Sequence, residues 1–131
     1  YVIISRQAYK LFGEIEHDDV IIFKSELTDM DGESKHLIKR VIGLPGDTIE
    51  IVDGYVIRNG VTIQEDYVAE QGLSGEMNPV IVEEGKVFVM GDNRRVSQDS
   101  RSSAIGQVDQ DTIIGKVVLR IYPFTSIKLY S

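Results

Sequence analysis

Two dipeptides six residues apart, Asp53-Gly54 and Asn59-Gly60, constrain the fold of this chain more than any other feature. Two-residue turns that join antiparallel strands need positive φ at their central residues, which Asp, Asn and Gly tolerate. The segments on either side of both dipeptides are rich in Val, Ile and Tyr, as strands usually are. Residues 48–63 therefore predict a compact antiparallel meander of three strands.

Short runs of β-branched and aromatic residues, each bounded by Gly, Asp, Asn or Pro, recur along the rest of the chain. Helix signals occur only at residues 109–114 and 6–11, and the polar segments 26–33 and 64–79 predict loops. We expect an all-β fold of antiparallel sheets. Further strands are predicted at residues 2–4, 20–23, 37–42, 80–82, 87–90 and 116–122. In this fold a β core would comprise residues 1–48 and 86–131, with 49–85 as a small inserted β cap.

The length, net charge and cysteine content of the chain exclude several classes of function. A chain of 131 residues is long enough for one domain with a real core. Its net charge of −7 argues against nucleic acid or an anionic membrane surface as the main partner. With no cysteine, disulfides, thiol catalysis and Cys-based zinc sites are excluded. No apolar run approaches the ~18 residues that span a bilayer, and we expect any membrane anchor to lie before Tyr1.

Eleven residues directly after the apolar run 87–90 combine charges and hydroxyls, with the sequence GDNRRVSQDSR (91–101). A loop with so few apolar side chains keeps one shape only if hydrogen bonds and ion pairs fix it. Ordered polar loops on rigid scaffolds often carry function, although a solvated surface loop is the simpler alternative. A metal site from Asp47, Asp92 and Asp99 is disfavoured, because the spacing is not that of a calcium loop and three arginines crowd it.

Lys39 is the candidate base. It lies inside the run LIKRVI (37–42), where strand alternation sends it to the face opposite its immediate neighbours. Loss of hydration among apolar residues lowers a lysine pKa from about 10.4 toward the range useful to a general base. An exposed cross-strand lysine is the simpler interpretation of this residue alone. A Ser-His-Asp triad through His36 is unsupported, because no Gly-x-Ser-x-Gly motif is present.

Two motifs in this order, KRVIGLPGD (39–47) and GDNRxxSxDSR (91–101), resemble those of the type I signal peptidases. These are membrane-anchored Ser/Lys-dyad proteases that remove signal peptides. The run DVIIF (19–23) resembles the family's strand before the lysine, with Asp18 where a glycine is usual. The resemblance covers residues 6–124, about nine tenths of the chain, and is greatest to Gram-positive members.

The resemblance implies that Lys39 is the general base and that the hydroxyl of Ser97 orients it. Two ion pairs would hold the loop against the lysine strand, namely Arg40 with Asp92 and Arg101 with Asp99. No cofactor and no metal are implied. Precursor segments bind as extended strands, so His36, Leu37 and Ile38 would form the substrate-binding edge that leads to the base.

The family's Ser-x-x-Pro nucleophile motif is absent, since Ser5 is followed by Arg-Gln-Ala. We therefore expect the nucleophile and the oxyanion donor to lie before Tyr1. The implied function is serine endopeptidase cleavage of secreted precursors or pilins at the extracytoplasmic face of the bacterial plasma membrane. One alternative is a catalytically deficient pilus assembly factor or chaperone that binds pilin without cutting it. Another is a hydrolase that uses Ser97 itself as the nucleophile.

Overall fold

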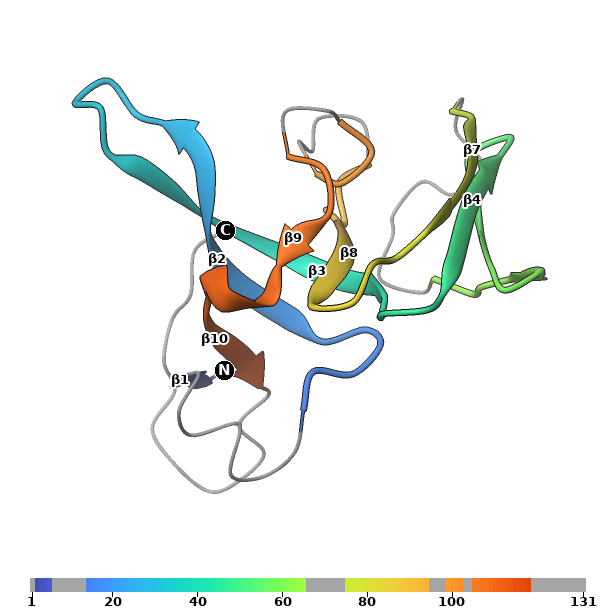
Figure 1. The fold of residues 1–131 in the computed structure, drawn as a ribbon, viewed down its shortest axis with the longest axis horizontal. Helices are drawn as coiled ribbons and strands as arrows, with labels where there is room; N and C mark the ends of the chain where they lie inside the picture. Colours follow the sequence, from blue (N-terminus) through green and yellow to red (C-terminus); the bar gives the residue numbers. More distant parts are fainter. Residues whose placement is uncertain (1, 6–13, 66–74, 95–98, 103–104, 119–131) are drawn as a thin grey trace.

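The computed structural model describes residues 2–5, 14–65, 75–94, 99–102 and 105–118 (Figure 1). These residues form antiparallel strands and one short 3-10 turn, which confirms the expected all-β fold. The strands are β1 (Val2–Ser5), β2 (Val20–Thr28), β3 (Ser34–Gly43), β4 (Thr48–Val52), β5 (Tyr55–Arg58), β6 (Val61–Thr62), β7 (Met77–Ile81), β8 (Lys86–Met90), β9 (Val108–Asp109) and β10 (Ile113–Val118).

The predicted meander is confirmed. Strand β4 pairs with β5, and β5 pairs with β6, through the two dipeptide turns. Asp53 and Gly54 have φ of 52° and 81°, and Asn59 and Gly60 have φ of 54° and 83°. Consecutive positive φ values are those of the primed turn, whose twist matches that of the flanking strands. The local sequence therefore determined both turns.

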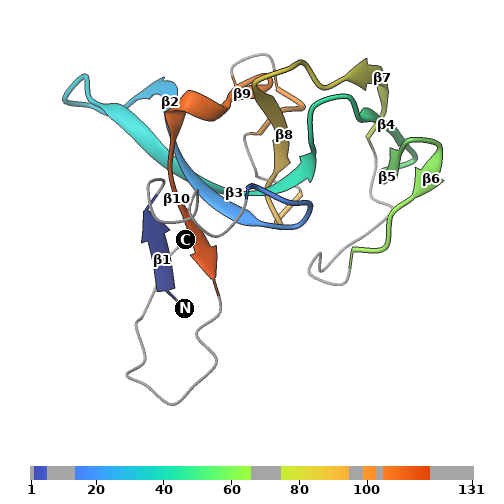
Figure 2. The same cartoon turned by 60° about the horizontal axis from the view of Figure 1, so that its bottom comes forward.

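The strands form two sheets. One has six strands in the order β1-β10-β2-β3-β8-β9, and the other has four in the order β6-β5-β4-β7. The β2–β3 hairpin projects at the upper left of Figure 1, and the four-stranded sheet lies on the opposite side of β8. Figure 2 shows the β1–β10 pair at the lower left, away from β5 and β6. Strands β3 and β8 thus connect the two parts of the molecule.

Strand β8 is buried on both faces and separates two apolar clusters. Val87 and Val89 join a cluster with Ile21 and Phe23 of β2. The alternate residues Phe88 and Met90 face a second cluster, which contains residues of the four-stranded sheet. A strand covered on both faces has no polar side to its pattern. This explains why residues 87–90 are continuously apolar.

Gly43 ends β3 where the chain passes from one sheet to the other. A Cβ at this position would lie 2.9 Å from Cγ2 of Val82 and 3.0 Å from Cγ1 of Ile49, inside normal contact distance. The backbone of β3 therefore packs directly against the second cluster, and only glycine fits this close approach.

The prediction of a helix over residues 109–114 is wrong. Asp109 caps a single 3-10 turn, η1 (Gln110–Thr112), by accepting a hydrogen bond of 2.9 Å from the amide of Asp111. Ile113 is already extended, pairs with Phe23 of β2 and is 2% exposed in the core. Burial and strand pairing thus outweigh the helix signal. The other helix candidate, residues 6–11, falls outside the described residues.

The two polar segments are shorter loops than predicted. Strand β2 continues through Thr28 and β3 begins at Ser34, so the segment 26–33 is partly strand. Strand β7 likewise begins at Met77, inside the segment 64–79. The extensions contain few apolar residues, Leu27 and Met77 among them, so they give little apolar alternation for sequence reasoning to detect.

Candidate functional site

Lys39 projects from the middle of β3 onto the apolar face of the six-stranded sheet. It lies directly opposite Ile21 of β2, and its neighbour Leu37 lies opposite Phe23. Residues opposite each other in an antiparallel pair extend to the same face. Because Ile21 and Phe23 are 0% and 2% exposed, the side chain of Lys39 leaves the strand beside the apolar core.

This position changes the acidity of the amine. Burial lowers the pKa of Lys39 from its ordinary value of 10.5, Asp99 opposes the shift and Arg101 adds to it. Asp99 and Arg101 are therefore close enough to act on Lys39, although they follow it by some sixty residues. A lysine with a lowered pKa has a larger neutral fraction near pH 7 and can accept a proton.

Asp99 is the buried acceptor at the centre of the loop. Its side chain is 1% exposed and accepts two hydrogen bonds from the Arg101 guanidinium, at 2.8 and 2.7 Å. The amides of Gly91 and Arg101 each donate another at 3.1 Å. Burial raises the pKa of Asp99, but the hydrogen bonds and charge of Arg101 and the two amides together lower it below its usual value. Asp99 is therefore held as an anion.

Ser100 fixes this part of the loop to β8. The amide of Val89 donates to the Ser100 hydroxyl at 2.9 Å, and the Ser100 amide donates to the Val89 carbonyl at 3.0 Å. These two bonds satisfy the backbone of Val89 much as a partner strand would. The motif that contains Ser100 indicated an ordered loop, but nothing in the sequence assigned this role to it.

Arg40 extends to the opposite face of β3 from Lys39 and contacts the other end of the same loop. Its Nε and Nη2 donate to the two carboxylate oxygens of Asp92 at 3.0 and 2.9 Å. A third bond of 2.9 Å runs from Nη1 to the carbonyl of Asp18. The loop that begins at Gly91 therefore acts on both faces of β3, through the ion pair of Asp92 with Arg40 on one side and the charge of Asp99 near Lys39 on the other.

The structure also shows the setting of the other predicted site residues. Strand β8 pairs with β3 only from Arg40 to Gly43, so no described strand covers the second edge of residues 36–39. His36 is exposed, whereas Leu37 is half-buried against the core. Leu37 and Ile38 lie on opposite faces, as alternation requires. Ser97 lies outside the described residues.

A buried ion pair that sequence reasoning missed connects this loop with the four-stranded sheet. The side chains of Glu65 and Arg94 are 3% and 8% exposed, and the guanidinium contacts both carboxylate oxygens. Glu65 follows β6, whereas Arg94 belongs to the loop motif. The two residues are 29 positions apart, and no local pattern connects them.

The metal interpretation finds no support in this arrangement. Asp92 and Asp99 are each paired with an arginine, and Asp47 bonds to His17 at 2.6 Å. Asp47 also accepts from the amide of Leu44 and from the side chain of Asn59, at 2.8 and 2.9 Å. The described part of the chain contains no group of three or more His, Asp or Glu residues that could hold a metal ion.

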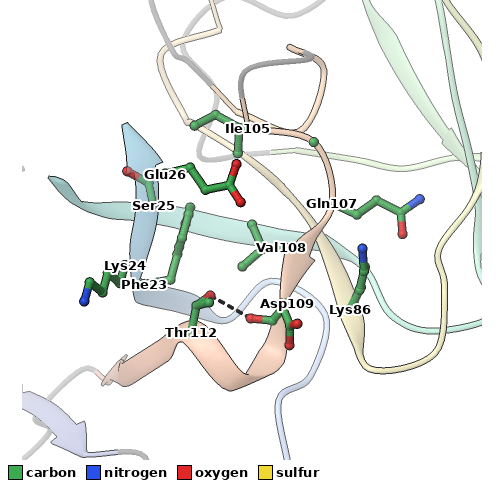
Figure 3. A pocket seen from close by; sticks show the side chains of 11 residues that line it. Phe23, Lys24, Ser25, Glu26, Lys86, Ile105, Gln107, Val108, Asp109 and Thr112 are labelled. Atoms are coloured by element: carbon green, nitrogen blue, oxygen red, sulfur yellow. Dashed lines mark hydrogen bonds between the residues drawn. The ribbon is translucent and has the colours of Figure 1, made fainter. Parts of the chain in front are cut away.

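A pocket of about 380 Å³ opens between β2 and the segment 105–109. Figure 3 shows Phe23, Ile105 and Val108 in its wall, with charged side chains of β2, β8 and β9 around them. None of the predicted site residues lines this pocket. The candidate site is therefore the surroundings of Lys39 rather than this pocket.

Comparison with known proteins identifies the family of this chain. The family model described as signal peptidase, peptidase S26, matches residues 1–122. A signal peptidase I of Bacillus licheniformis is 38% identical over 125 residues, which cover 88% of this chain and 64% of that relative. A probable signal peptidase I-1 of Synechocystis is 36% identical over 124 residues, or 93% of this chain and 62% of the relative.

A solved structure extends the likeness to the fold. The crystal structure of a signal peptidase I from Enterococcus faecalis V583 superposes with a TM-score of 0.67 at 31% identity, covering 81% of this chain and 98% of that one. The chain therefore belongs to the signal peptidase, peptidase S26, family, as the two motifs predicted. It spans less than two thirds of the length of both curated relatives described above. No helix in the described residues is long and apolar enough to cross a membrane.

Proposed function

We propose that the whole protein is a serine endopeptidase that removes signal peptides from secreted precursors at the extracytoplasmic face of the bacterial plasma membrane. An N-terminal segment outside this chain would anchor it there. One observation carries the proposal, namely the half-buried Lys39 on the apolar face of β3, with a lowered pKa and with the buried Asp99 and its partner Arg101 near it. Membership of the family supplies the reaction class.

In this proposal Lys39 acts as the general base. Its neutral amine accepts the proton of a serine hydroxyl as the oxygen attacks the scissile carbonyl, and the proton then passes to the leaving amine. The Lys39 amine, neutral again, next removes a proton from the water that hydrolyses the acyl-enzyme. The nucleophilic serine is proposed to lie before Tyr1, since this sequence holds no Ser-x-x-Pro motif. Ser97 is proposed to orient the lysine amine.

The edge of β3 at residues 36–38, which no described strand covers, would bind the substrate. An extended peptide can add to an exposed strand edge through main-chain hydrogen bonds, while pockets read its alternate side chains. Residues 36–38 present such an edge immediately before Lys39. Half-buried Leu37 and Ile38 would leave room only for small side chains, which fits a preference for Ala-x-Ala before the cleavage site.

The test compares two lysines on one strand of the full-length protein. Lys39→Ala removes the base, so we expect precursor cleavage to fall by about 10²–10⁴-fold. Lys35→Ala is the matched control, because Lys35 lies on the same face of β3 and is exposed. Cleavage is followed by gel electrophoresis of a secretory precursor. Cleavage by Lys39→Ala within tenfold of wild type would exclude the base assignment.

The assembly-factor alternative rests on the absent Ser-x-x-Pro motif. If the full-length protein lacks a nucleophilic serine, it would bind a pilin or its leader peptide and leave it intact. Incubation with labelled pilin precursor distinguishes the two functions, because a peptidase yields mature pilin and a chaperone yields a stable complex with uncut precursor.

A further inference from the structure

Glu65 is a buried carboxylate that the proposed reaction does not use. It lies just after β6, in a chain segment that leaves the four-stranded sheet, and its side chain is 3% exposed. Ionised carboxylates are seldom buried unless a cation pairs with them. Here the cation is Arg94, whose Nη1 donates to Oε1 of Glu65 at 3.1 Å while Nη2 donates to Oε2.

Arg94 belongs to a closed ring of hydrogen bonds within the loop. Its Nε donates to the Gly91 carbonyl at 2.7 Å, and the Gly91 amide donates to Asp99 at 3.1 Å. Asp99 binds the Arg101 guanidinium, and Nη2 of Arg101 donates back to the Arg94 carbonyl at 3.1 Å. Glu65 is attached to this ring from the segment that follows β6.

The ring supplies the charges that face Lys39 from the loop. Within the described residues of the loop, Asp99 and Arg101 both act on the amine, the first favouring its protonated form and the second opposing it. On the side of β10, the Lys116–Asp19 pair at 2.9 Å lies across Ile21 from Lys39. The Arg40–Asp92 pair is on the opposite face of β3. Movement of the ring would therefore alter the surroundings of Lys39 directly.

We propose that Glu65 is a positioning residue for Lys39, which acts by fixing Arg94 and thereby holding the ring of Gly91, Arg94, Asp99 and Arg101 closed beside the amine. The four-stranded sheet then contributes to the candidate site through one carboxylate. Without that carboxylate the guanidinium of Arg94 is buried and unpaired, so it turns toward solvent and opens the ring. The half-buried Lys39 is then more exposed to water, which favours its charged form.

The first test measures the amine itself and needs no activity. In the chain labelled with ¹³C at lysine Cε, the Lys39 resonance, identified by its loss in Lys39→Arg, is titrated by NMR. We expect Glu65→Gln to raise the titration midpoint by about one pH unit. Glu65→Asp, which keeps the charge, should remain within about 0.3 unit of wild type. Glu84→Gln, a matched change at an exposed glutamate, should leave the midpoint unchanged.

The second test rests on the proposed function and uses the full-length enzyme. We expect Glu65→Gln to lower kcat by about tenfold or more with KM nearly unchanged, and to move the acidic limb of the pH–rate profile upward. An inactive wild-type enzyme would contradict the proposed function, while the NMR titration would still decide the role of Glu65.

Three results would overturn the positioning role. These are an unchanged Lys39 midpoint in folded Glu65→Gln, a downward shift of that midpoint, and an Asp variant as strongly shifted as the Gln variant. If Glu65→Gln does not fold, Arg94→Lys replaces it. That variant keeps both charges but loses the Nε donor to Gly91, so it must also raise the midpoint.

Discussion

Asp47 and Asp99 are both acceptors at the centre of a hydrogen-bond cluster, but the two clusters are built differently. The donors to Asp99 come from its own loop, and its ion-pair partner Arg101 is two residues away. The donors to Asp47 come from three separate segments, through His17, Leu44 and Asn59. Asp99 therefore orders one loop, whereas Asp47 joins the segment before β2, the β3–β4 connection and the β5–β6 turn.

Burial also differs between the two carboxylates. Asp99 is 1% exposed and has a guanidinium as partner, while the side chain of Asp47 is 15% exposed. A fully buried anion requires a charged partner, whereas a partly solvated one can be held by hydrogen bonds of more modest strength. We infer that loss of the Asp99 carboxylate costs more, and three predictions test this difference.

The largest effect is expected for Asp99→Ala. This change leaves Arg101 without its partner beside the core, and breaking one side of a buried pair costs about 3–5 kcal/mol. The free energy of unfolding is measured by urea denaturation. Asp31→Ala, at an exposed turn residue, is the control and should stay within about 0.5 kcal/mol of wild type. Equal stability of the two variants would contradict the inferred importance of the buried pair.

Asp47→Ala should have a smaller effect, about 1–3 kcal/mol. It leaves the Leu44 amide without its acceptor and removes the contacts to His17 and Asn59, but water can reach the site. The same urea titration measures it. A loss as large as that of Asp99→Ala would show that joining three segments matters more than burial, and would reverse the comparison.

The smallest effect is a change in pH dependence. Burial raises the pKa of each carboxyl, but the hydrogen bonds and the charged partner lower it by more. Both pKa values therefore lie below the ordinary 3.8 in the folded protein. The stability from each group is therefore full above its unfolded pKa and is lost as pH falls through the folded one. Asp47→Asn and Asp99→Asn should each flatten the fall in unfolding free energy between about pH 5 and pH 2. An unchanged slope in either variant would contradict the lowered pKa of that residue.

The same contrast explains what could be predicted from sequence. Asp99 and Arg101 are close in the chain, and their pairing follows from the motif that contains both. The pairing of Arg40 with Asp92 could be predicted only from the resemblance to a family, because 52 residues separate the two. The contacts of His17 with Asp47 and of Glu65 with Arg94 join distant residues that no local pattern or motif connects. They depend on how the two sheets pack, which short-range rules do not determine.

Asp18 shows another limit of local reasoning. The sequence places an aspartate where the family usually has glycine, and the structure gives it a φ of 70°. Glycine is common at such positions because it adopts positive φ without strain, and aspartate is among the few residues that tolerate this conformation. The substitution is thus compatible with the turn, and its carbonyl still accepts the bond from Arg40.

The double burial of β8 has a consequence for how the molecule opens. Both apolar clusters contain side chains of this one strand, so neither can be exposed to solvent without disturbing the other. The backbone amides of β8 should therefore exchange with deuterium only through global unfolding. Any natural or engineered replacement of the four-stranded sheet must also accommodate Phe88 and Met90. A chain that lost the sheet alone would expose these two side chains as an apolar surface that promotes aggregation.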